Sequence, residues 1–125
     1  MTISDADRRI KEETTAIYSC TLKDEDGNAI SDVALTTLTL TLYDSVTGDI
    51  INDRDGQNVL NANNVTVASG VLTWTMQPED TAIIHSSSLR DPEVHIALFE
   101  WTYDSGTKAG KHELKLEIVN LRKVE

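Results

Sequence analysis

The stretch EVHIALFEWTYDSGTKAGKHELKLEIVNL, residues 93–121, decides the fold of this chain. Residues 94–103 are rich in β-branched and aromatic side chains, and residues 111–121 alternate between apolar and polar side chains. The glycine-containing segment 104–110 separates the two runs. Two strand-like runs joined by a short loop of this kind predict an antiparallel β-hairpin.

The two arms of the hairpin differ in their alternation. In the second arm, Leu114, Leu116 and Ile118 share one face, which predicts a strand with one buried and one solvent-facing side. The first arm is apolar on both faces, with one row formed by Val94, Ile96 and Leu98 and the other by Ala97, Phe99, Trp101 and Tyr103. Such a strand lies in the middle of a sheet, or its second face meets another molecule.

Two more strands are predicted in the first third of the chain. Residues 15–22 form one strand, and residues 33–43 form another that carries a row of inward-facing leucines. That row consists of Leu38, Leu40 and Leu42. Leu35 is out of phase with the row, which predicts a β-bulge near Thr36 and Thr37.

The middle of the chain continues the pattern. Residues 49–52 predict a short strand, and the polar segment 54–64 predicts a surface loop. Residues 65–68 and 71–77 flank Ser69-Gly70, which is typical of a tight hairpin. With turn signals about every 8–12 residues, the chain predicts an all-β, immunoglobulin-like antiparallel β-sandwich of about seven to eight strands.

Residues 1–13 predict a short, partly helical N-terminal arm, and residues 14–125 predict the sandwich itself. Ser4 and Asp7 resemble a helix-capping pair, but Ile3 and Ile10 belong to an apolar stripe that is too narrow for a helix that is stable alone. We therefore expect the arm to become ordered only against a partner, with a frayed terminus as the alternative. Deleting residues 1–13 is then expected to leave the sandwich folded.

Composition excludes several classes of function. The 125 residues indicate one domain, and 11 Lys and Arg against 21 Asp and Glu give a net charge of −10, which disfavours nucleic acid and anionic membrane surfaces as partners. No apolar run approaches the roughly 18 residues that a membrane span needs. Cys20 is the only cysteine, so an internal disulfide and a cysteine zinc site are excluded, as is typical of a reducing compartment.

The three histidines do not predict a metal site. If the hairpin turns near Thr107, His112 lies opposite roughly Tyr103, about 26 Å along the strand from His95. These two imidazoles would then be too far apart to share an ion. His85 lies in a separate segment without an obvious partner.

The acidic turns fail the EF-hand spacing, although looser calcium sites at Asp24 and Asp26 or at Asp53 and Asp55 stay open as alternatives to solvated turns. Residues 86–88 are three serines beside His85, but the strand–elbow–helix context of a serine nucleophile is missing. No glycine-rich phosphate loop is present. The sequence therefore predicts a protein that is not an enzyme and needs no cofactor or resident metal.

A series of short motifs follows in a characteristic order: LKD at 22–24, DGNAI at 26–30, LYD at 42–44, TG at 47–48, SGVLTW at 69–74, DT at 80–81 and FEWTYDSG at 99–106. Their order resembles the small immunoglobulin-like virion proteins of tailed bacteriophages, and is similar to the N-terminal domain of baseplate upper proteins. PEDTA at 78–82 also resembles the corner run of antibody variable domains, which implies that the chain crosses from one sheet to the other there.

The phage resemblance implies a non-enzymatic structural part of a virion, assembled in the host cytoplasm: a neck, tail or baseplate adaptor, or a capsid decoration protein. Such a part would dock in several copies, as a homo-oligomer or ring, onto other virion structural proteins. The predicted docking surface combines the arm with the aromatic face of residues 94–103, namely Ile3, Ile10, Phe99, Trp101 and Tyr103. The alternative is a carbohydrate-binding or adhesin-type module in which the same aromatics form an exposed stacking platform.

Overall fold

A computed structural model describes residues 2–3, 9–11, 13–84 and 93–119. These residues contain strands and turns but no helix, and so none that could cross a membrane. The strands are β1 (Thr2–Ile3), β2 (Arg9–Lys11), β3 (Ile17–Thr21), β4 (Leu35–Asp44), β5 (Gln57–Asn58), β6 (Val65–Ala68), β7 (Val71–Thr75), β8 (Glu93–Tyr103) and β9 (Lys108–Val119).

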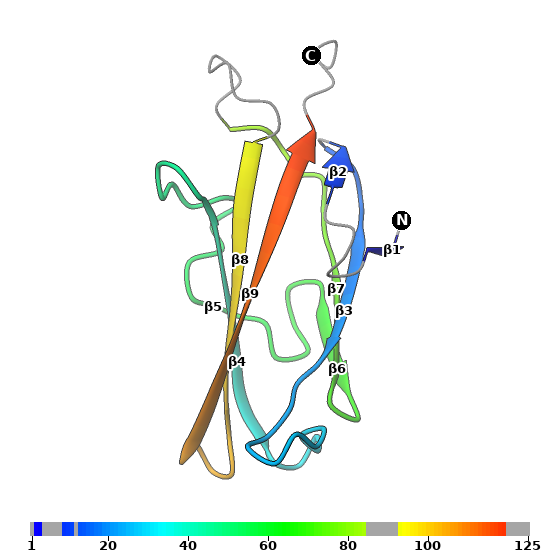
Figure 1. The fold of residues 1–125 in the computed structure, drawn as a ribbon, viewed down its shortest axis with the longest axis vertical. Coiled ribbons are helices and arrows are strands. Elements are labelled where there is room, and N and C mark those ends of the chain that lie inside the picture. The colour runs from blue at the N-terminus through cyan, green and yellow to red at the C-terminus, as the bar shows by residue number, and fades with distance from the viewer. Residues whose placement is uncertain (1, 4–8, 12, 85–92, 120–125) are drawn as a thin grey trace.

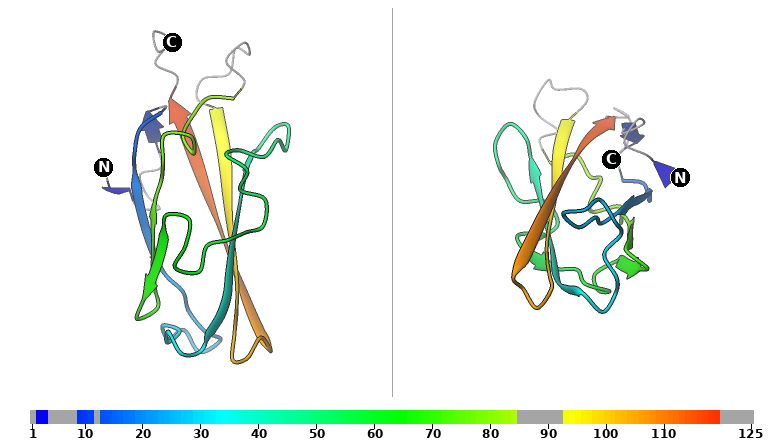
Figure 2. Two further views of the ribbon diagram at one scale, coloured as in Figure 1. Left: turned by 180° about the vertical axis from the view of Figure 1, so that it is seen from behind. Right: turned by 60° about the horizontal axis from the view of Figure 1, so that its bottom comes forward.

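The strands form two sheets that pack face to face as a β-sandwich (Figures 1 and 2). One sheet has the order β1-β3-β7-β6, and the other has the order β2-β9-β8-β4-β5. From β3 onward the chain crosses between the sheets after β3, after β5 and after β7, which is the immunoglobulin-like arrangement. The sequence predicted this fold class and the crossing near residues 78–82 correctly.

The organising hairpin is β8–β9, whose register runs from Glu93 opposite Ile118 to Tyr103 opposite Lys108. Its loop is shorter than the sequence suggested, because residues 104–106 all take a positive φ and turn the chain at once. The register therefore places His112 opposite Phe99, and the predicted pairing of His112 with Tyr103 is wrong.

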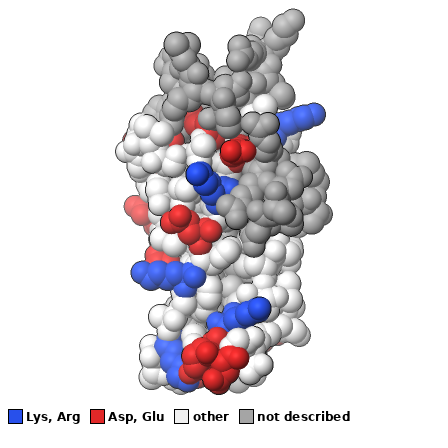
Figure 3. All heavy atoms as spheres, viewed as in Figure 1, with Lys and Arg blue, Asp and Glu red and all other residues white. Residues whose placement is uncertain are grey.

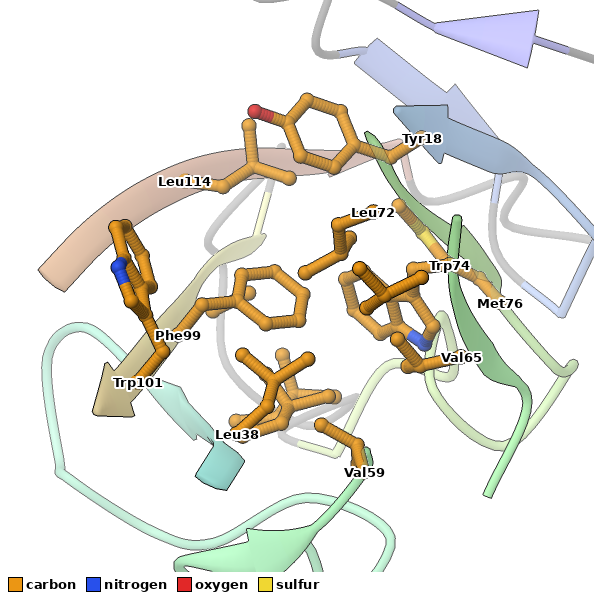
Figure 4. Close-up of a cluster of buried hydrophobic side chains, with 14 of the residues drawn as sticks. Tyr18, Leu38, Val59, Val65, Leu72, Trp74, Met76, Phe99, Trp101 and Leu114 are labelled. Atoms are coloured by element: carbon orange, nitrogen blue, oxygen red, sulfur yellow. The ribbon is translucent and has the colours of Figure 1, made fainter. Parts of the chain in front are cut away.

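Rows of side chains from both sheets fill the space between them, as the alternation predicted. The fully buried rows are Leu38, Leu40 and Leu42 of β4, Leu72, Trp74 and Met76 of β7 and its end, and Leu114, Leu116 and Ile118 of β9. Trp74 and Phe99 meet edge to face at the centre, with ring centroids 5.7 Å apart (Figure 4). This contact joins the two sheets.

The predicted bulge is present, since the pairing of β4 with β8 shifts between Leu35 and Thr37. The predicted strand at 49–52 is wrong: within it only Ile50 forms a bridge, to Tyr43. Asn52 and the residue after it take a positive φ and interrupt the regular pairing, and the Arg54 carbonyl then accepts the Leu42 N–H at 2.8 Å. On the side of β4 away from β8, the strand that pairs with it is β5, inside the segment predicted as a loop.

Arg54 begins that segment and is buried, with only 2% of its side chain exposed. Its guanidinium donates from Nε to Asp80 Oδ1 at 2.6 Å and from Nη2 to Asp80 Oδ2 at 3.0 Å. It also donates to Gln57 Oε1 at 2.8 Å and lies over the Trp74 ring at 5.8 Å from the centroid. A two-pronged contact of this kind fixes both distance and orientation, and it ties the 54–64 segment to the 77–81 turn.

The N-terminal segment differs most from expectation. Residues 9–11 form β2, which pairs in parallel with residues 117–119 of β9, so the predicted partial helix is wrong there. Ile10 is fully buried in the core of the same molecule, because this pairing directs it between the sheets. Ser4 and Asp7 lie outside the described residues. The described residues form nine strands, more than the predicted seven to eight, because the arm contributes β1 and β2.

Candidate functional site

The predicted docking surface lies mostly inside the molecule. Ile10 and Phe99 have no exposed area, and Trp101 and Tyr103 are only 7% and 5% exposed. The side chain of Ile3 is outside the described part of the structure. This corrects the sequence-based surface: β8 is apolar on both sides, and the aromatic side is the one that faces the four-stranded sheet.

The other side of β8 faces outward and forms an apolar strip. Val94 and Leu98 are half-buried there, and Ile96 is 8% exposed without belonging to the core cluster. Tyr43 pairs with Ile96 on one side and with Ile50, which is 40% exposed, on the other. We call these five residues the outer patch. The apolar row at residues 94, 96 and 98 was visible in the sequence. Docking was nevertheless assigned to the aromatic row on the opposite face of the strand.

The outer patch is bordered by polar rows on both sides. On β9, Glu113, Lys115 and Glu117 lie opposite Leu98, Ile96 and Val94. On β4, the threonines at 37, 39 and 41 continue the outward row below Tyr43. An apolar strip with a charged border resembles the apolar centre and polar rim that are typical of protein–protein interfaces.

Acidic and basic side chains meet at the end of the molecule where β8 turns into β9 (Figure 3). Lys108 Nζ contacts Glu25 and lies 3.3 Å from Asp104 Oδ2. The hydrogen bond from Lys108 lowers the pKa of Glu25, and the bonds to Glu25 and Asp104 raise the pKa of Lys108. Burial, helped by the Glu25 carboxylate, raises the pKa of Tyr103. These contacts hold the 24–28 turn against the β8–β9 hairpin.

The same turn holds the first of the two looser calcium alternatives. Asp24, Glu25 and Asp26 bring ligand oxygens within 4.8 Å of one another. Asp24 Oδ1 already accepts the backbone N–H groups of Asp26 and Asn28, and Glu25 is engaged by Lys108. These hydrogen bonds and this ion pair stabilise the 24–28 turn. Asp53 and Asp55 join no group of three metal-ligating side chains among the described residues.

The two described histidines serve separate structural contacts. His95 is fully buried, and its Nε2 lies 2.6 Å from Glu93 Oε1. His112 Nε2 lies 2.7 Å from the hydroxyl oxygen of Tyr18, with the two rings parallel to within 4°. In the observed register His112 lies opposite Phe99, which is four positions along β8 from His95. The two histidines are therefore about 13 Å apart along the strand. They do not converge on one site.

A groove of about 520 Å³ runs between the edges of β3 and β9. Its wall on β3 includes Ser19, Cys20 and Thr21, and its wall on the other sheet includes Lys111 and His112. Trp101 also borders the groove, but its small exposed area does not provide the flat platform that the carbohydrate-binding alternative requires. His85 and the serines at 86–88 lie outside the described residues.

Trp101 keeps its position because the residue opposite it is Gly110. A Cβ added at Gly110 would lie 2.5 Å from the indole ring. Replacing Gly110 with alanine should therefore displace Trp101 and lower the free energy of unfolding by about 1–3 kcal/mol. The expected readout is a red shift of tryptophan fluorescence together with a lower urea midpoint. Ala109→Val, on the neighbouring exposed residue, is the control, and an unchanged spectrum in Gly110→Ala would contradict the packing described.

No protein-family model matches the chain, and neither a curated protein nor a solved structure matches it at a significant level.

Proposed function

We propose that this protein is a non-enzymatic structural component of a tailed-phage virion that docks in several copies onto a larger symmetric assembly. Neck, tail or baseplate adaptor and capsid decoration are the positions that fit. The order of short motifs along residues 22–106 supports the phage setting. The observation that carries docking is the outer patch, an apolar strip on a sandwich whose own core is already filled.

The outer patch favours a particular kind of partner. Burying its apolar area on another protein supplies the driving force, because removal of apolar surface from water dominates most protein association. The net charge of −10 favours a partner whose matching apolar surface has a basic border. Charge complementarity of this kind speeds encounter and selects the partner, while the apolar contact supplies most of the affinity.

The buried ionisable groups support a structural role as well. Arg54 is paired with Asp80, and His95 is paired with Glu93, each within hydrogen-bonding distance. The Arg54–Asp80 pair joins two separate segments, whereas Glu93 and His95 lie two residues apart on β8. Buried ionisable side chains are ordinarily hydrogen-bonded to a partner, as both of these pairs are.

The virion assignment is tested by mass spectrometry of tailed particles purified from the source of the sequence. The chain is expected to sediment with the particles at a fixed copy number relative to the major capsid protein. Genes for tail or capsid proteins are expected on both sides of its own gene. Recovery only in the host protein fraction, with metabolic genes on both sides, would contradict the proposal.

The docking surface is tested with a matched pair of variants. Ile50 on the outer patch is 40% exposed, and Val71 on the other sheet is 41% exposed. Ile50→Glu should reduce incorporation into particles roughly tenfold, because a carboxylate would be buried against the partner without compensation. Val71→Glu should incorporate normally, and both variants should unfold at nearly the urea concentration of the wild type. Equal incorporation of the two variants would show that the outer patch is not the contact.

A further inference from the structure

The longest described strand, β9, has no described partner strand along most of one edge. β9 has twelve residues, and on the side away from β8 only residues 117–119 pair with a described strand, β2. The remaining nine residues, 108–116, are here called the open edge. A strand edge of this length is a template for pairing with another strand. The question is which strand could pair with it.

We propose that two copies of this protein pair through their open edges, antiparallel, about a two-fold axis at His112. The pairing joins the two five-stranded sheets into one continuous sheet. It does not rest on the virion assignment or on the outer patch. The axis position follows from the edge itself, because His112 is the middle residue of the nine. Pairing the whole edge provides about nine backbone hydrogen bonds between the copies.

The charges on the outward face of β9 select this register. In it, Lys111 of each copy lies opposite the partner's Glu113, twice by symmetry. Moving the axis to residue 111 places Lys111 opposite itself, and moving it to residue 113 places Lys111 opposite the partner's Lys115. Like charges directly opposite each other are destabilising and opposite charges are stabilising. Basic and acidic side chains are interspersed over the side of the molecule on which β9 lies in front (Figures 1 and 3).

The inward face fits the same register. Within one copy, large and small residues alternate across the strands, since Trp101 lies opposite Gly110 and Ala97 lies opposite Leu114. The two-fold pairing sets Gly110 beside the partner's Leu114. The Trp101 ring, which lies over Gly110, then packs toward that leucine and continues the large–small alternation across the boundary.

The groove between β3 and β9 borders the open edge at Lys111 and His112, beside the contact that Tyr18 of β3 makes with His112. The buried Trp101 Nε1 has no hydrogen-bond acceptor within the described structure. Figure 4 shows this nitrogen on the side of the ring turned away from Phe99. The groove marks this side of the sandwich as the one at which a neighbour can approach.

The test is sedimentation velocity of the full chain over a concentration series in 0.15 M salt, where the roughly 8 Å Debye length screens the net repulsion between two acidic copies. A reversible species of twice the 13.8 kDa chain mass is expected. Lys111→Glu should raise the dissociation constant roughly tenfold or more, because both opposite-charge contacts become repulsive. Adding Glu113→Lys to this variant should restore the dimer, because the charges are then exchanged.

Lys115→Glu is the matched control. It makes the same change of charge on the same face of β9, but in this register residue 115 lies opposite the partner's Ala109, so the dissociation constant should change less than threefold. Backbone amide exchange at residues 108–116 should slow on dimerisation. A chain that stays monomeric, equal effects of the two lysine variants, failure of the exchanged pair to restore dimerisation, or slowed exchange elsewhere would each overturn the proposal.

Discussion

Replacing Arg54 with alanine is expected to lower the free energy of unfolding by about 3–5 kcal/mol, because it leaves the carboxylate of Asp80 buried without its cation. Asp80 is fully buried and also accepts the backbone N–H of Gln77 at 2.8 Å. The loss combines two bonds to Asp80 with the contact over Trp74. Urea unfolding followed by far-ultraviolet circular dichroism measures it.

Two further variants separate the causes. Arg54→Lys keeps a positive charge but loses the forked geometry, so its loss should be smaller than that of Arg54→Ala. Asp55→Ala removes an exposed carboxylate from the next residue and should stay within about 0.5 kcal/mol of the wild type. If Arg54→Ala also stayed within that range, the ion pair would not hold the loop, and the network would be incidental.

Ile10→Ala is expected to destabilise the folded protein by about 2–5 kcal/mol, because it empties a fully buried site between the sheets. For the same reason, deleting residues 1–13 should weaken the isolated sandwich, which reverses the expectation from the sequence alone. Lys11→Ala, at the exposed neighbour on the same strand, is the control. The thermal midpoint in calorimetry is the readout. Equal midpoints for Ile10→Ala and Lys11→Ala would place the first strands outside the cooperative unit.

Local patterns predicted the parts of the fold whose determinants are close in sequence. The alternation of β9, the leucine row of β4 and the Ser69-Gly70 turn each specify a strand or hairpin within about a dozen residues. The bulge in β4 followed from one residue out of phase. In each case, the period of two in side-chain direction was sufficient.

The parts that were missed depend on contacts between distant residues. Ile10 pairs with Ile118 at the far end of the chain, so the short N-terminal segment gave no signal of its own. Arg54 is separated from Asp80 by 26 residues, and an arginine at the start of a polar segment is ordinarily a surface residue.

The candidate site was misplaced for a related reason. Both faces of β8 are apolar, so alternation could not decide which face meets the second sheet. The aromatic row was chosen for docking, whereas the larger side chains fill the core. The acidic 24–26 turn invited a calcium site, and its partner Lys108 lies on another strand that only the fold brings close.

The parallel pairing of β2 with the end of β9 has a mechanical consequence. A pull on both ends of the chain would enter this pair at Arg9 and leave it at Val119, which lie at opposite ends of the three-residue ladder. The force would then shear all of its hydrogen bonds together instead of opening them one after another. We expect such a link to resist tension along the chain far better than its length suggests, a useful property wherever a protein must transmit load between two attachment points.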